Sequence, residues 1–216
     1  IMVGIEKIIQ DESLEMVLVQ GDTNTVLGGS LAASKQNVSV GHVEAGLRSF
    51  DRTMPEEINR IVSDHVSDLL FAPTHTSKKH LIDEGIPEHK IHITGNTAVD
   101  AVYQNKGIAK KKRDPLFKYD LQAGEYFLVT AHRAENTDSF ERLGGIIDGL
   151  EKVQEKHGLS ILYPVHPRTR KMLAHFGIKT DKLELIDPVG YLDFLVLQSN
   201  ARLILTDSGG IQEEAC

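Results

Sequence analysis

The segment "LILTDSGGIQEEA", residues 203–215, joins an apolar run to a polar turn and the start of a helical pattern. Leu203 to Thr206 has the length and composition of a buried strand, and Ser208 with two glycines follows it. A strand, a tight turn and a helix in this order are the repeating unit of parallel α/β sheets. The segment therefore predicts an α/β fold.

The same alternation continues along the chain, with helical patterns between most of eight apolar runs. The clearest helix begins near Pro55, where apolar residues recur at spacings of three and four from Ile58 as far as Leu70. The predicted strands are Met16–Val19, Val38–Val40, Leu69–Ala72, Lys90–Thr94, Tyr126–Thr130, Ser160–Pro164, Leu183–Ile186 and Arg202–Thr206.

Composition bounds the class of protein. With 40% hydrophobic and 25% charged residues, the 216-residue chain is globular in composition. A net charge of −7 argues against a general electrostatic grip on nucleic acid, and the basic cluster at 110–113 is interpreted as a solvated linker. No apolar stretch approaches the roughly 18 residues of a membrane helix. We therefore expect neither a nucleic-acid nor a membrane partner.

Cysteine and histidine usage argues against metal and disulfide chemistry. Cys216 is the single cysteine, so an internal disulfide and a cysteine-based zinc site are excluded, which fits a reducing cytoplasm. The histidines are scattered without H-E-x-x-H or comparable ligand spacing, so no metal site is predicted.

Polar residues follow four of the predicted strands, at positions 21–25, 41–44, 130–133 and 207–210. The carboxyl ends of parallel strands form the ligand-binding edge of open α/β sheets, so these strand ends predict a shared cleft. At 208–210, a phosphate could approach the glycine backbone at the helix start, or Ser208 could cap an ordinary turn. Glu214, in the following helix, could accept from ribose hydroxyls or complement the helix dipole.

The acidic residues have competing interpretations. Glu44 lies between glycines as an acid or base candidate, with Arg48 as its alternative ion-pair partner. Asp22 either caps the following helix or acts as a base. Glu56 fits a capping box with Thr53, which residue-level reasoning favours, although Pro55 could instead occupy the first helical position. Glu57 is expected to face solvent.

Two histidines end predicted strands. His132, followed by Arg133, and His166 at the end of the next strand could each bind a phosphate or donate a proton, although a lone histidine is more often structural.

Eight segments, taken in order, resemble the non-hydrolysing UDP-N-acetylglucosamine 2-epimerases, and the resemblance runs over essentially the whole chain. They are "QGDTNT" (20–25), "GHVEAGLRS" (41–49), "MPEEINR" (54–60), "FAPT" (71–74), "TGNT" (94–97), "VTAHRAEN" (129–136), "YPVHPR" (163–168) and "LTDSGGIQEEA" (205–215).

The resemblance implies two Rossmann-like domains in the glycosyltransferase-B architecture. The pattern of elements breaks after Gly95-Asn96, so we expect an N-terminal domain over 1–96 and a UDP-binding C-terminal domain over 97–216. The chain opens directly on a helix and stops soon after Gly210, and family members are longer at both ends. We therefore expect an internal fragment with both domains incomplete, which would be inactive alone.

The implied reaction converts UDP-N-acetylglucosamine to UDP-N-acetylmannosamine, a precursor of cell-surface polysaccharides. Family enzymes eliminate UDP to give 2-acetamidoglucal and add UDP back, with no cofactor, and the full-length protein is expected to be a cytoplasmic homodimer. By motif, the catalytic candidates are Asp22, Glu44, Glu56 and His132, and which of them removes the C2 proton stays open. The candidate UDP contacts are Phe194, Ser208, Gly209, Gly210 and Glu214.

Arg133 and His166 match positions at which bacterial members bind a second substrate molecule as activator. The spacer "SFDRTM", residues 49–54, is shorter than in bacterial members and closer to archaeal ones, which argues against that regulation. The alternatives are a hydrolysing epimerase, which releases UDP and free N-acetylmannosamine, and a nucleotide-sugar binding protein or glycosyltransferase of the same architecture.

Overall fold

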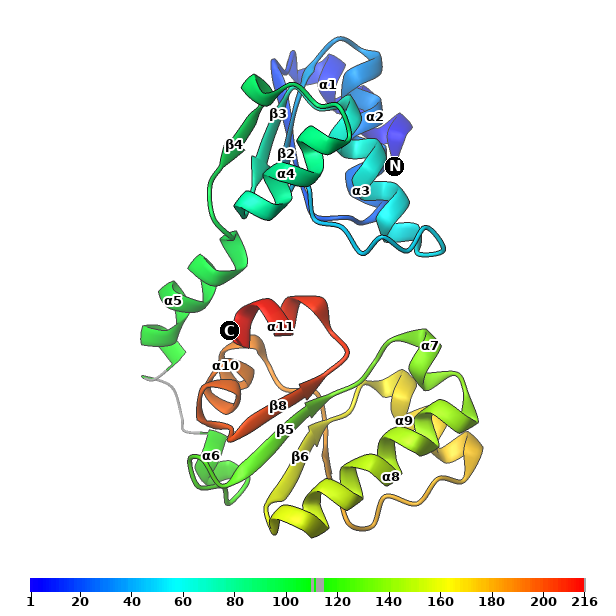
Figure 1. The fold of residues 1–216 in the computed structure, drawn as a ribbon, viewed down its shortest axis with the longest axis vertical. Helices are drawn as coiled ribbons and strands as arrows, with labels where there is room; N and C mark the ends of the chain where they lie inside the picture. Colours follow the sequence, from blue (N-terminus) through cyan, green and yellow to red (C-terminus); the bar gives the residue numbers. More distant parts are fainter. Residues whose placement is uncertain (110, 112–114, 216) are drawn as a thin grey trace. The chain divides into compact units, whose positions relative to one another are not determined.

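The computed structural model describes residues 1–109, 111 and 115–215 (Figure 1). Most of the basic cluster at 110–113 and Cys216 lie outside the described residues. The chain divides into two compact units, Ile1–Thr97 and Ala98–Cys216. Each unit is built around its own four-stranded parallel sheet.

The N-terminal unit has the sheet order β1-β2-β3-β4, so each strand pairs with the next one in the chain. Consecutive parallel strands need a crossover between them, and a helix provides each one. The strands are β1 (Met16–Gln20), β2 (Ser39–Val43), β3 (Leu69–Ala72) and β4 (Ile91–Ile93). The helices are α1 (Met2–Glu12), α2 (Asn24–Lys35), α3 (Pro55–Val66), α4 (His75–Asp83) and the 3₁₀ turn η1 (Glu88–Lys90).

The C-terminal unit has the order β7-β6-β5-β8. Its strands are β5 (Tyr126–Thr130), β6 (Ser160–Pro164), β7 (Glu184–Ile186) and β8 (Leu203–Thr206). The chain runs outward from β5 to β7 and returns to place β8 on the other side of β5. Such a reversal is a topological switch point, where open α/β sheets bind ligands.

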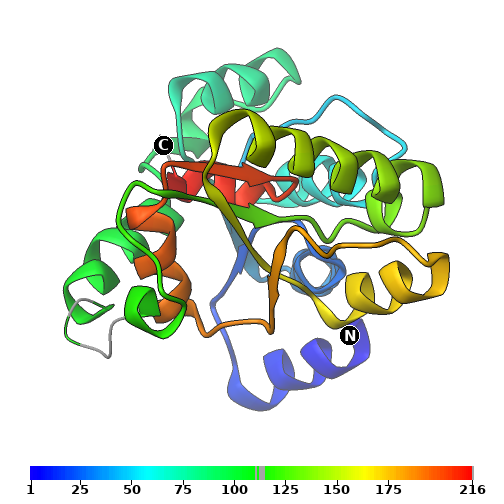
Figure 2. The same ribbon diagram turned by 90° about the horizontal axis from the view of Figure 1, so that it is seen from below.

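Helices cover this second sheet, and α6 lies beside α10 (Figures 1 and 2). They are α6 (Pro115–Lys118), α7 (Ala134–Thr137), α8 (Phe140–His157), α9 (Pro167–Phe176), α10 (Tyr191–Asn200) and α11 (Gly209–Ala215). α5 (Thr97–Ala109) begins at the division between the units.

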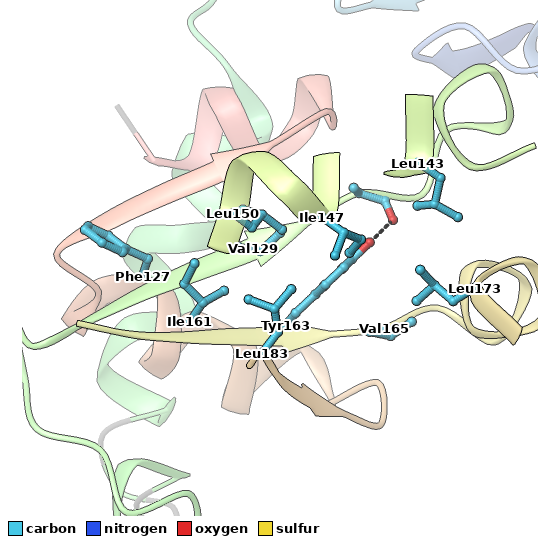
Figure 3. Close-up of a cluster of buried hydrophobic side chains, with 11 residues drawn as sticks. Phe127, Val129, Leu143, Ile147, Leu150, Ile161, Tyr163, Val165, Leu173 and Leu183 are labelled. Carbon is cyan, nitrogen blue, oxygen red and sulfur yellow. Dashed lines mark hydrogen bonds between the residues drawn. The ribbon is translucent and has the colours of Figure 1, made fainter. Parts of the chain in front are cut away.

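Both faces of β5 are buried, which explains its unbroken apolar run. Phe127 and Val129 join the cluster that includes Leu143 and Ile147 of α8 (Figure 3). Tyr126 and Leu128 point the other way and pack in a second cluster with residues of β6 and α10. The central strand is therefore anchored on both sides, and its carboxyl end is a rigid base for the loop that follows.

All eight predicted strands are present: three have the predicted bounds, and the ends of the other five shift by at most three residues. The long predicted helix is wrong at its end. α3 stops at Val66 because Ser67 is extended, and Leu69 and Leu70 pair with β2 as part of β3. Their apolar spacing fits a helix equally well, and tertiary pairing decides the outcome.

Candidate functional site

Asp22 and Glu44 both lie at the carboxyl edge of the N-terminal sheet, in the turns after two neighbouring strands. They follow β1 and β2, whose last residues Gln20 and Val43 are directly paired. Gln20 Nε2 donates to Glu44 Oε1 at 2.8 Å. A Cβ placed on Gly21, which has φ +82°, would lie 3.5 Å from Glu44 Oε2. The two carboxylates therefore border one turn, as a shared site requires.

Glu44 itself has φ +70°, in the left-handed region that side-chain-bearing residues seldom adopt. Strained backbone of this kind is concentrated at functional sites. The alternative prediction, an ion pair between Glu44 and Arg48, is wrong. Arg48 Nη2 pairs instead with Asp64 at 2.7 Å and with Glu84 at 2.6 Å. Glu44 is left half-buried at the strand end.

Asp22 does not cap the following helix, since that role belongs to Thr23, whose hydroxyl accepts from the Val26 amide. The Asp22 carboxylate instead accepts from Arg60 Nε at 3.0 Å and from Nη2 at 2.5 Å. About a third of its side chain stays exposed. A carboxylate that is held in place and partly accessible can act as a base or stabilise positive charge.

Glu56 is exposed, and the predicted capping box is wrong. Pro55 is the first helical residue, and Met54 precedes it without a side-chain cap. The Thr53 amide, which the box would use, donates to Asp51 Oδ1 at 2.9 Å. Glu56 is thus available for chemistry.

Glu57 is buried, which contradicts the expectation that it faces solvent. Its carboxylate accepts from the amides of Ser49 at 2.9 Å and Phe50 at 3.0 Å, and from Arg60 Nη1 at 2.8 Å. Burial opposes its charge, but these donors outweigh it and lower the pKa of Glu57. Of the two adjacent glutamates, Glu57 is structural.

A buried ionic cluster beneath this edge was not predicted from the sequence. His42 Nδ1 lies 2.6 Å from Asp64 Oδ1 and Nε2 lies 2.8 Å from the Gly21 carbonyl. Because both neighbours are acceptors, both ring nitrogens donate and the imidazole is cationic. Burial disfavours the charge, but the Asp64 hydrogen bond and charge outweigh it, so the pKa of His42 is raised.

The same Asp64 also accepts from the Gly46 amide at 3.2 Å. Gly46 has φ +79°, and a Cβ there would lie 2.3 Å from the Ser77 carbonyl, so only glycine fits. The cluster thereby holds the turns on both sides of Glu44. A histidine and an aspartate at inward positions of β2 and α3 were the signal available in the sequence.

Asp207 organises the edge of the C-terminal sheet and was missing from the predicted site residues. It accepts from the amides of His132 and Arg133, each at 3.0 Å, and from Asn136 Nδ2 at 3.0 Å. His132 Nδ1 is 3.3 Å from its other oxygen. The loops after β5 and β8 are therefore joined at the topological switch point.

A cavity of about 270 Å³ opens beside this junction. It brings together three predicted site residues, His132, His166 and Phe194, from separate segments. Tyr163 supports its rim by donating to the Ala131 carbonyl at 2.6 Å (Figure 3). Burial and the charge of Asp207 raise the pKa of this tyrosine, which keeps it a neutral donor. The remaining lining residues are Thr130, Ala131, Pro164, Pro188, Val189 and Ile211.

The other predicted UDP contacts lie around α11. Ser208 donates its amide to Thr206 Oγ1 at 2.9 Å, and Gly209 and Gly210 are exposed. Glu214 lines a second cavity, of about 260 Å³, with Tyr103 and Gln198. Burial and the charge of Glu213 raise the pKa of Glu214.

Arg133 pairs with Glu135 at 3.5 Å, and His166 caps α9 by accepting from the Arg168 amide. No group of three or more metal-ligating side chains occurs among residues 1–109, 111 and 115–215. Within the same ranges, none of the helices is both long and apolar enough to cross a membrane.

Comparison with known proteins agrees with the geometry. A family model described as UDP-N-acetylglucosamine 2-epimerase matches residues 1–216. The Methanococcus maripaludis protein of that name is 53% identical over all of this chain, which covers 61% of the relative. A UDP-2,3-diacetamido-2,3-dideoxy-D-glucuronate 2-epimerase from Pseudomonas aeruginosa is 44% identical over 99% of the chain and 59% of that protein.

Among solved structures, the Methanocaldococcus jannaschii UDP-GlcNAc 2-epimerase in complex with UDP-GlcNAc and UDP has a TM-score of 0.90. It is 52% identical over 100% of this chain and 61% of that one. The expected α/β fold, with two Rossmann-like units of the glycosyltransferase-B type, is confirmed. This chain belongs to the UDP-N-acetylglucosamine 2-epimerase family.

Proposed function

We propose that this protein interconverts UDP-N-acetylglucosamine and UDP-N-acetylmannosamine without net hydrolysis. The observation that carries the proposal is that Asp22 and Glu44 follow two paired strands at the same edge of the sheet, with Gln20 donating to the Glu44 carboxylate. A 52% identical relative in complex with UDP-GlcNAc and UDP supports this substrate. The chain spans 61% of that relative, so the activity is proposed for a protein of the relative's length.

The C2 hydrogen has no adjacent carbonyl to make it acidic, so direct proton exchange is hard. In the proposed route the C1–O bond breaks, UDP leaves with the electron pair, and a base takes the C2 proton to give 2-acetamidoglucal. UDP then adds back to C1 while C2 is protonated from the opposite face. Atoms balance without a cofactor.

Three carboxylates supply the base and stabilise positive charge at C1 in this proposal: Asp22, Glu44 and Glu56. His132 is proposed to donate a proton to the departing phosphate oxygen of UDP, as an imidazole can. Its ring lines the cavity beside Asp207. An anion must also be held between the two half-reactions, since diffusion of UDP would leave the glucal stranded.

UDP is assigned to the C-terminal unit, with residues 1–96 as the sugar-side domain and 97–216 as the UDP-binding domain. Phe194 is proposed to contact uracil, because it lines the cavity at the switch point. Ser208, Gly209 and Gly210 are proposed for the diphosphate, and Glu214 for the ribose hydroxyls. Arg133 and His166 would lie on the sugar side or at a regulatory site. The full-length protein is proposed to be a cytoplasmic homodimer that supplies polysaccharide precursors.

Proton NMR of the relative-length enzyme with UDP-N-acetylglucosamine in deuterated solvent tests the proposal. We expect UDP-N-acetylmannosamine with deuterium at C2, and no product from a Glu44→Gln control. Accumulating free N-acetylmannosamine would identify a hydrolysing enzyme. Failure to exchange the C2 hydrogen would leave a binding protein or glycosyltransferase.

The Pseudomonas relative makes UDP-2,3-diacetamido-2,3-dideoxy-D-glucuronate the second substrate to assay. Its lower identity, 44% against 53%, favours the unmodified sugar. A higher kcat/KM for the glucuronate would reverse that choice.

A further inference from the structure

Arg60 connects two carboxylates that have different tasks. Its Nε and Nη2 donate to Asp22 Oδ2, and its Nη1 donates to Glu57 Oε2 at 2.8 Å. Only 16% of the arginine side chain and 2% of the Glu57 side chain are exposed. The guanidinium is therefore committed in a fixed orientation, with Asp22 at one end and Glu57 at the other.

Glu57 in turn holds the spacer at residues 49–54. It accepts from the amides of Ser49 and Phe50 and from the Ser49 hydroxyl. Phe50 has φ +58°, a strained conformation for a bulky residue, and these bonds help to hold it. The spacer backbone is thus linked through two side chains to the Asp22 carboxylate.

We propose that Arg60 is a positioning residue: it aims the Asp22 carboxylate at the sugar and ties that aim to the conformation of the 49–54 spacer. The inference rests on the proposed epimerisation. It assigns Arg60 no contact with the substrate, since the residue acts through the two carboxylates to which it donates.

An ordinary exposed ion pair would predict little effect, since such pairs contribute roughly 0–1 kcal/mol. This pair differs because the same guanidinium is also bonded to the buried Glu57, so that three of its N–H groups are used at once. A lysine has one flexible ammonium and cannot reproduce the fork. The reaction rate is sensitive to the position of a catalytic group, and a displacement of about 1 Å can lower it about 10²-fold.

The test compares Arg60→Met and Arg60→Lys in the relative-length enzyme, with Arg52→Met as matched control from the exposed part of the spacer. We expect Arg60→Met to lower kcat by about 10²-fold with KM within about threefold. Arg60→Lys should be intermediate, and Arg52→Met should match wild type.

A double-mutant cycle with Asp22→Asn separates positioning from general support of the fold. If Arg60 acts through Asp22, Arg60→Met should lower kcat little further in a protein that already carries Asp22→Asn. The inference is overturned if Arg60→Met lowers kcat by the same factor with and without Asp22→Asn, or if Arg60→Met keeps the kcat of the wild type. If Arg60→Met does not fold, Arg60→Lys completes the same cycle.

The two proposals fail in different ways. If the wild-type enzyme does not exchange the C2 hydrogen, both the proposed function and this inference are contradicted. An active wild type with unaffected Arg60 variants sinks the inference alone.

Discussion

His42 and Asp64 form a buried ion pair, with Nδ1 and Oδ1 2.6 Å apart and both side chains fully shielded from solvent. The second ring nitrogen donates to the Gly21 carbonyl at 2.8 Å, next to Asp22. The pair therefore links the interior of the N-terminal unit to the turn that carries a proposed catalytic carboxylate.

This pair predicts that stability depends on pH. The folded-state pKa of His42 is raised above its ordinary value of 6.5, so its stabilising contribution is complete below about pH 6.5. It is lost as pH rises through the folded pKa. The unfolding temperature of the wild type should therefore fall as the pH rises over this range. The His42→Gln variant should unfold at a lower temperature, and that temperature should depend less on pH. Parallel pH profiles for the two proteins would contradict the assignment.

Glu56 and Glu57 should separate activity from stability. Glu57→Ala leaves the Ser49 and Phe50 amides without their acceptor and should lower the free energy of unfolding by about 2 kcal/mol. Glu56→Gln should change stability by less than about 0.5 kcal/mol while abolishing epimerisation. Denaturant unfolding and NMR assays check both. An unstable Glu56→Gln protein would show that we have reversed the two roles.

Asp207 should control UDP affinity through the loop after β5. Asp207→Ala removes the acceptor of the His132 and Arg133 amides, and we expect UDP to bind about tenfold more weakly, or about 1.4 kcal/mol. Asp207→Asn keeps one carbonyl oxygen as acceptor, so it should lose less affinity for UDP than Asp207→Ala. Calorimetric titration measures this, with the exposed Asp187→Ala as control. Equal affinities for Asp207→Ala and wild type would mean that this loop does not position the UDP site.

Glu44 should show a trade between stability and function. Its φ of +70° costs a side-chain-bearing residue about 1 kcal/mol, which glycine avoids. Glu44→Gly should therefore unfold at a higher temperature than Glu44→Ala, and both should be inactive. A more stable alanine variant would show that the left-handed conformation carries no strain.

Local sequence patterns were sufficient to locate the strands. Each strand was recognisable because an apolar run of the right length, such as Tyr126–Thr130, is bounded by polar turns, and both depend on neighbouring residues alone. The same patterns placed Asp22, Glu44 and His132 after strands, where the structure has them, and their catalytic roles stay a prediction. The first helical position of Pro55 was also among the local alternatives.

Contacts between distant segments determined the rest. The local pattern could not distinguish Glu56 from Glu57, because the donors that bury Glu57 come from Ser49, Phe50 and Arg60 once the spacer has folded back. Arg48 likewise paired with Asp64 rather than with nearby Glu44. Charged side chains have many partners within reach in a sequence, and burial selects among them, because a buried charge without donors or acceptors is too costly to keep.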